Sequence, residues 1–225
     1  MNAADEETAR AGAGHLLRVE RSDLAQLLAR ARVLAGQGGR RMLGITGSPG
    51  AGKSTLAEEV VAAMGRAAVL VPMDGFHLAQ VQLAALGRTA TKGAIDTFDV
   101  GGFVHLLQRL CRADESVVYA PAFRRDLEEP IAGTIAIPAE VPLVVVEGNY
   151  LLAESAGWCG VRELLDEVWF LDPPDDLRLE RLIARHMLFG RDRPAAKERS
   201  LGSDQVNAEL VASTRHRSDV LVVGR

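Results

Sequence analysis

Gly47-Ser48-Pro49-Gly50-Ala51-Gly52-Lys53-Ser54 fits the phosphate-binding pattern G-x-x-x-x-G-K-[ST] at every constrained position. The apolar run 42–45 before it is typical of a buried strand, and residues 55–61 after it are typical of a helix. The motif requires this order of strand, loop and helix. The stretch therefore predicts a P-loop.

Each part of the predicted P-loop has a physical role in holding the phosphates of a nucleotide. The glycines let the backbone bend with its N–H groups pointing inward, and the following helix adds its N-terminal partial positive charge. We expect Lys53 against the β- and γ-phosphates and the Ser54 hydroxyl on Mg²⁺. The predicted ATP-binding residues of the loop are Gly47, Ser48, Gly50, Ala51, Gly52, Lys53, Ser54 and Thr55.

Composition bounds the class of protein. The chain has 225 residues, of which 48% are hydrophobic, which suffices for one α/β domain over residues 1–225 with a substantial core. Its formal net charge of −4 and aromatic content of 4% disfavour a nucleic-acid binder. Two cysteines without metal spacing, no signal peptide and no membrane-spanning run predict a soluble cytoplasmic protein.

Strands alternate with helices along the rest of the chain, which predicts a mostly parallel sheet with helices on both faces. Residues 1–14 are expected to fray, and residues 88–99 and 121–129 are expected to be loops. A helix from Asp175 would carry Arg178, Arg181 and Arg185 on its polar face. The other predicted helices cover 24–34, 78–86, 100–112 and 203–215, and the other strands cover 67–73, 116–119, 134–137, 143–147, 168–172 and 219–223.

Two carboxylates at strand ends favour phosphoryl transfer over a mere nucleotide switch. Asp74 ends the strand after the P-loop helix, where we expect it beside the P-loop strand as the base that receives the acceptor's hydroxyl proton. Helix capping is the structural alternative for Asp74. Glu147 ends the most strand-like run of the chain, where a Mg²⁺ ligand belongs.

A run of arginines predicts a lid at about residues 185–200. Arg181 and Arg185 lie late in the predicted helix, and Arg191 and Arg193 follow in a loop with Gly190 and Pro194. Folded over the triphosphate, Arg185 and Arg191 would neutralise charge in the transition state, and Arg193 would hold ATP. A solvated helix face is the alternative for any one of them.

A GTPase is disfavoured by two features of the sequence. Asp99-Val100-Gly101-Gly102 matches the pattern D-x-x-G, but no buried strand precedes it. The guanine-reading pattern N-K-x-D does not occur.

The ordered motifs resemble those of the uridine kinase, phosphoribulokinase and type I pantothenate kinase group. They are the P-loop, Met73-Asp74-Gly75-Phe76-His77, Asp96-Thr97-Phe98-Asp99, Val146-Glu147-Gly148-Asn149-Tyr150 and Gly190-Arg191-Asp192, and the resemblance extends over about residues 41–223. Within the group, the chain is most similar to bacterial nucleoside/nucleotide kinase family and fructose transport system kinase-like proteins. The resemblance implies that Asp74 is the catalytic carboxylate. It also implies that Asp99, Tyr119 and Arg124 or Arg125 lie near the acceptor.

We therefore expect an ATP- and Mg²⁺-dependent kinase that phosphorylates a hydroxyl of a small polar metabolite such as a nucleoside, sugar or pantothenate-like compound. The alternatives are a regulatory ATPase without an acceptor and a nucleoside monophosphate kinase. The expected partner is the small-molecule acceptor, with neither nucleic acid nor membrane, and a homodimer is left open. The predicted acceptor pocket consists of Asp74, His77, Asp99, Tyr119, Phe123 and Arg124.

Overall fold

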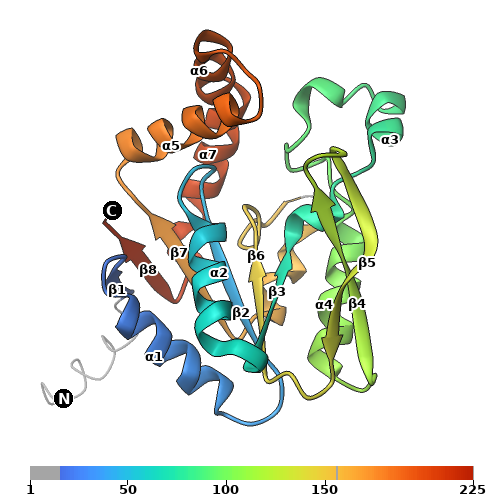
Figure 1. The fold of residues 1–225 in the computed structure, drawn as a ribbon, viewed down its shortest axis with the longest axis vertical. Helices are drawn as coiled ribbons and strands as arrows, with labels where there is room; N and C mark the ends of the chain where they lie inside the picture. Colours follow the sequence, from blue (N-terminus) through green and yellow to red (C-terminus); the bar gives the residue numbers. More distant parts are fainter. Residues whose placement is uncertain (1–15, 156, 225) are drawn as a thin grey trace, which may run out of the picture.

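The P-loop strand β2 (Arg41–Gly47) lies inside a six-stranded sheet in which every paired strand is parallel. The computed structural model describes residues 16–155 and 157–224, so the predicted fraying of residues 1–14 lies outside the described residues. The strand order is β1-β8-β7-β2-β6-β3 (Figure 1). The other five strands are β1 (Leu17–Glu20), β3 (Ala68–Pro72), β6 (Leu143–Glu147), β7 (Glu167–Asp172) and β8 (Val220–Val223).

The order of the central strands corrects one expectation. β3 was predicted beside the P-loop strand, but β6 pairs with both β2 and β3 and separates them. The register aligns Ile45 of β2 with Glu147, and Glu147 with Pro72 at the end of β3. Glu147 is therefore next to the P-loop strand, and Asp74 follows a strand one position further along the sheet.

Helices cover both faces of the sheet, as predicted (Figure 1). Successive residues of a strand point to opposite faces, so Leu43 packs in the core below α1 (Leu24–Ala35) and α2 (Lys53–Met64), whereas Met42 packs in the core below α4 (Val100–Arg112). Asp23 caps α1 by accepting a hydrogen bond from the Gln26 N–H at 3.0 Å. The predicted helices at 24–34 and 100–112 are thus confirmed.

A β-hairpin replaces the charged loop predicted at 121–129. β4 (Val117–Arg124) pairs with β5 (Glu129–Pro138), and the register shifts between Ala120 and Ala122. Pro121 lies in this irregularity, where the ladder loses little from a missing N–H. A Cβ on Gly75 would lie 2.4 Å from the Pro121 carbonyl oxygen, so the hairpin packs directly on the turn that carries Asp74.

Three helices gather at the end of the molecule above the P-loop, and α3 (Gln80–Ala85) lies on the other side of that end (Figure 1). They are α5 (Asp175–Leu188), α6 (Arg193–Leu201) and α7 (Ser203–Ser213). The loop predicted around Arg193 and Pro194 is wrong, because both residues belong to α6. Asp192 caps α6 by accepting from the Ala195 N–H at 2.8 Å, and proline is well tolerated in a first helical turn. No helix of the described residues is long and apolar enough to cross a bilayer.

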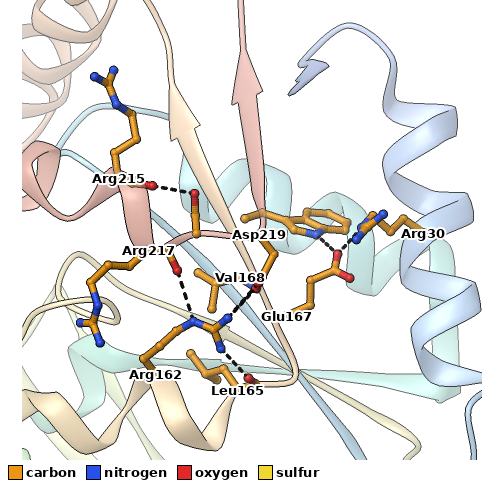
Figure 2. A network of polar contacts seen from close by, with 10 residues as sticks. Arg30, Arg162, Leu165, Glu167, Val168, Arg215, Arg217 and Asp219 are labelled. Atoms are coloured by element: carbon orange, nitrogen blue, oxygen red, sulfur yellow. Dashed lines mark hydrogen bonds and ion pairs between the residues drawn. The ribbon is translucent and has the colours of Figure 1, made fainter. Parts of the chain in front are cut away.

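A polar network fastens β7 and β8 to the segment that precedes β7 (Figure 2). The Arg162 guanidinium donates to both carboxylate oxygens of Asp219 at 2.9 and 3.0 Å, to the Leu165 carbonyl at 2.9 Å and to the Arg217 carbonyl at 3.3 Å. Asp219 also accepts the Val168 N–H at 2.7 Å. Arg162 thus satisfies several carbonyl and carboxylate oxygens at once.

We expect Arg162→Met to lower the free energy of unfolding by about 2 kcal/mol, because it leaves the part-buried Asp219 carboxylate without its counter-ion. The measurement is urea unfolding. Arg112→Met is the control, because the contact that the described residues offer Arg112 is an exposed ion pair with Asp114 at 3.5 Å. Its effect should stay within about 0.5 kcal/mol. Equal effects of the two changes would contradict a structural role for the network.

Candidate functional site

A cavity of about 510 Å³ opens beside the P-loop, where α5 to α7, the β4–β5 hairpin and the 88–99 segment meet. Eight of the predicted site residues line it: Lys53, Ser54, Asp74, His77, Phe123, Glu147, Arg185 and Arg191. The structure therefore brings the predicted phosphate-binding, carboxylate and lid residues together in one space. The remaining lining residues are Pro49, Thr89, Lys92, Gly93, Phe98, Arg125, Glu128, Gly148, Asn149, His186, Phe189, Arg199, Asp204 and Asn207.

The P-loop has the backbone that its glycines predict. Gly47, Gly50 and Gly52 have φ angles of +146°, +85° and +95°, a region that side chains with a Cβ rarely adopt. At Gly50 a Cβ would also lie 2.5 Å from the Arg178 carbonyl oxygen. The buried Lys53 ammonium donates to the Ser48 carbonyl at 3.2 Å, across the loop. The Lys53 side chain thus links the two ends of the loop.

Arg178 is predicted on the polar face of its helix, but its side chain is only 5% exposed. Its guanidinium donates to the Pro49 carbonyl at 3.3 Å, the Asp175 carboxylate at 2.9 Å and the Gln205 side-chain oxygen at 2.9 Å. The P-loop is therefore anchored to α5 and α7. The sequence does not reveal this contact with the P-loop, because Arg178 is on the polar face of its helix and the Pro49 carbonyl is distant in the sequence.

Lys53 and Glu147 are two buried groups of opposite charge that attract each other. Burial lowers the pKa of Lys53 to about 8, partly offset by the nearby Glu147 carboxylate. Burial raises the pKa of Glu147 to about 7, while Lys53 and the Ser54 hydroxyl favour its charged form. Since each group is expensive to bury alone, their proximity stabilises both charges.

Asp74 lies in a short 3-10 turn, Met73–Phe76, directly after β3. Its carboxylate caps no helix in the described residues, because neither this turn nor α3 has a side-chain cap, so the capping alternative is wrong. The side chain is 35% exposed and lies 3.7 Å from the Arg125 guanidinium. Its charge is also felt by Lys53 and Glu147, whose pKa values it raises. Asp74 thus stays accessible to a ligand at the cavity wall.

His77 is fixed next to Asp74 by a hydrogen bond and by two aromatic rings. Its Nδ1 lies 2.9 Å from the Asp74 carbonyl oxygen, which can only accept, so Nδ1 carries the proton and Nε2 is the acceptor of the neutral ring. The ring centroid lies 4.1 Å from that of Phe98 and 5.0 Å from that of Phe123. Burial lowers the pKa of His77, so the neutral form is favoured at neutral pH.

Outside the phosphate-binding loop, residues 47–55, four predicted site residues do not line the cavity. Asp99 caps α4 by accepting from the Gly102 N–H at 2.9 Å, and Arg124 pairs with Asp126 at 2.7 Å outside it. Tyr119 is 58% exposed on β4, and Arg193 starts α6. These placements correct the predicted pocket: Arg125, not Arg124, is the hairpin arginine that lines the cavity.

A second group of lining residues ties α5, α6 and α7 to one another and to the 88–99 segment. Arg199 of α6 donates to the carbonyls of Ala90 and Lys92, each at 3.0 Å. The nearly buried Asp204 lies 2.6 Å from the His186 Nε2 and 3.7 Å from the Arg199 Nε. Sequence reasoning missed these residues because their partners are more than 100 positions away or on another helix, so no local spacing marks them.

A family model described as the methylmalonyl Co-A mutase-associated GTPase MeaB matches residues 17–73, which run from β1 through β3 and end before Asp74. The ATP-dependent kinase-like protein notR' of Aspergillus versicolor is 35% identical over 161 residues, or 68% of this chain and 94% of that protein. The uridine kinase of Leuconostoc citreum (strain KM20) is 32% identical over 152 residues, or 64% of this chain and 67% of that protein.

A solved structure from Silicibacter sp. TM1040, provisionally named a fructose transport system kinase, superposes with a TM-score of 0.79. Its sequence is 34% identical, and the match covers 88% of this chain and 98% of that one. The chain belongs to the P-loop kinases of the uridine kinase and phosphoribulokinase group. Membership of this ATP-binding kinase group confirms the resemblance and the fold class predicted from the motifs. The GTPase match covers only the segment with the phosphate-binding loop.

For the site of this P-loop kinase, we expect Glu147→Gln to flatten the pH dependence of stability. The pKa of Glu147 is about 7 in the folded protein and 4.5 in an ordinary environment, so between these pH values the folded protein binds more protons than the unfolded chain. The free energy of unfolding of the wild type therefore falls as the pH rises through this range. From pH 5 to pH 8, stability of the variant relative to wild type should rise by on the order of 1–3 kcal/mol. Urea unfolding of the ligand-free proteins measures it. A constant difference would show that Glu147 is not held in a proton-favouring environment.

Proposed function

We propose that the protein transfers the γ-phosphoryl group of ATP to a hydroxyl of a small polar metabolite, with Asp74 as the base. The observation that supports this most strongly is the shared cavity. Its lining includes a strand-end carboxylate that still reaches solvent, the P-loop lysine, the Ser54 hydroxyl and a second, buried carboxylate. Direct in-line transfer requires this combination of phosphate cradle and acceptor-side base.

In this proposal the chain's own residues divide the work of transfer. Asp74 orients the acceptor hydroxyl and takes its proton, and the unprotonated Nε2 of His77 accepts a hydrogen bond from the acceptor. Lys53, Arg185 and Arg191 stabilise charge on the phosphoryl oxygens. Neither Arg185 nor Arg191 has a carboxylate partner among the described residues, which leaves their guanidinium groups available to phosphates.

The donor set of the cavity suits Mg²⁺. Ser54 offers a hydroxyl and Glu147 a carboxylate, and oxygen ligands of this kind, together with substrate phosphates, are those that the ion prefers. Among the described residues, no cluster of three His, Cys, Asp or Glu side chains could hold a metal alone, so phosphates would complete the site. The ion, when bound, neutralises phosphate charge. Ser54 and Glu147 would hold it.

We expect Asp74→Asn to lower acceptor-stimulated ADP release by about three orders of magnitude, because the amide cannot take the hydroxyl proton. The assay uses Mg-ATP with nucleosides, free sugars including fructose, sugar monophosphates and pantothenate. Asp126→Asn is the matched control, since Asp126 pairs with Arg124 outside the cavity.

Two outcomes of this assay would favour another function. Near-full turnover by Asp74→Asn with the correct acceptor would remove Asp74 as the base. Slow ATP hydrolysis that no acceptor stimulates, and that is equal in Asp74→Asn and wild type, would favour the regulatory ATPase module.

A further inference from the structure

The wall of the cavity formed by the hairpin and the 88–99 segment holds a poorly hydrated cation, Lys92. Its side chain is only 15% exposed, and its ammonium lies 4.9 Å from the centroid of the Phe123 ring. The ammonium donates to the Glu128 carbonyl, and the nearest carboxylate, that of Glu128, is 3.9 Å away and 65% exposed. Lys92 thus gives up most of its water for one carbonyl hydrogen bond, a cation–π contact and a distant, solvated counter-ion.

Arg125, at the tip of the hairpin, is a second cation on the same wall. Its guanidinium is 3.7 Å from the Asp74 carboxylate, too far for a hydrogen bond, and its central carbon lies 5.4 Å from the centroid of the Phe189 ring. Among the described residues it donates no side-chain hydrogen bond that meets ordinary geometry. Its planar set of donors, which suits carboxylates and phosphates, therefore faces the cavity unused.

The positive charges of Lys92 and Arg125 both influence His77 in the cavity wall. Both positive charges lower the pKa of His77, in addition to the larger effect of burial, although Asp74 opposes them. His77 also stacks on Phe123, the ring below Lys92. The two cations, the neutral histidine and the proposed base thus surround one small volume.

Other cations line the side of the cavity where the proposed phosphoryl donor, ATP, would bind. Lys53, Arg185 and Arg191 line the part of the cavity that the P-loop and lid supply. On the wall with Lys92 and Arg125, a neutral polyol would need hydrogen-bond donors and acceptors. It would not offset the free-energy cost of desolvating the Lys92 ammonium. An anionic group would repay it and would give Arg125 two matched acceptor atoms.

We propose that the acceptor carries an anionic group, a carboxylate or a phosphate, which binds between Lys92 and Arg125 while its hydroxyl faces Asp74. This inference rests on the proposed kinase function and names its substrate class. The anion takes the place of Asp74 as the partner of Arg125, which leaves the Asp74 carboxylate to the hydroxyl proton. Phe123 and Phe98 exclude water from the contact.

The first test measures anion binding without catalysis. The protein is saturated with Mg²⁺ and a non-hydrolysable ATP analogue, which occupies the P-loop side, and is titrated with inorganic phosphate or malonate at constant ionic strength in a calorimeter. We expect saturable binding of at least one of them, weakened about tenfold or more in Lys92→Met and in Arg125→Gln. Arg124→Gln is the matched control and should bind as wild type does. Absent binding, or equal binding by all four proteins, would overturn the inference.

The second test separates substrate class from kinase activity. A pentose, its 5-phosphate and the corresponding aldonate are compared as acceptors, and we expect kcat/KM for an anionic member to exceed that of the neutral sugar by about 100-fold. Lys92→Met should remove most of this preference with the KM for ATP unchanged. If the neutral sugar is the better acceptor, and turnover is lost in Asp74→Asn but unchanged in Lys92→Met, the anionic acceptor is overturned and the kinase function stands. ADP release that no acceptor stimulates, and that Asp74→Asn does not alter, would overturn the kinase itself.

Discussion

The attraction between the buried charges of Lys53 and Glu147 is the constraint on which the site depends. Parallel pairing of β6 with β2 brings Glu147 beside the P-loop strand, because the register aligns it with Ile45. Neither charge is easily buried alone, and the attraction between them lowers the free-energy cost of burying both at the base of the cavity. The same insertion of β6 moves β3 one strand away, which puts Asp74 on the far side of Glu147 from the P-loop strand.

Packing outside the sheet then determines how the pocket is enclosed. Gly75 allows the hairpin to approach the turn of Asp74, and Arg178 fixes the P-loop to the helices above it. Arg199 links those helices to the 88–99 segment. Three connections between elements distant in the sequence therefore surround one cavity. A change in any of them would alter the space between donor and acceptor before it altered a reacting group.

The local features of the fold could be predicted from the sequence, because apolar runs, caps and glycines are readable over a few residues. The P-loop, Glu147 at its strand end and the helix capped by Asp23 were found in this way. The position of β6 between β2 and β3 could not be, since alternating strands and helices give no strand order. The β4–β5 hairpin was missed because Pro121 and the charges at 124–129 are typical of a loop, while a two-stranded ribbon tolerates both.

The same distinction explains which site residues the sequence revealed. Residues that end a strand or belong to a motif, such as Asp74 and Lys53, line the cavity as expected. Arg124 and Arg125 are neighbours with equal chemistry, and successive residues of a strand and its turn point in different directions, so only the hairpin geometry selects Arg125. Lys92 is equally unmarked in its loop. The acceptor side of such a cavity is therefore determined by tertiary packing, whereas the phosphate side is determined by a local motif.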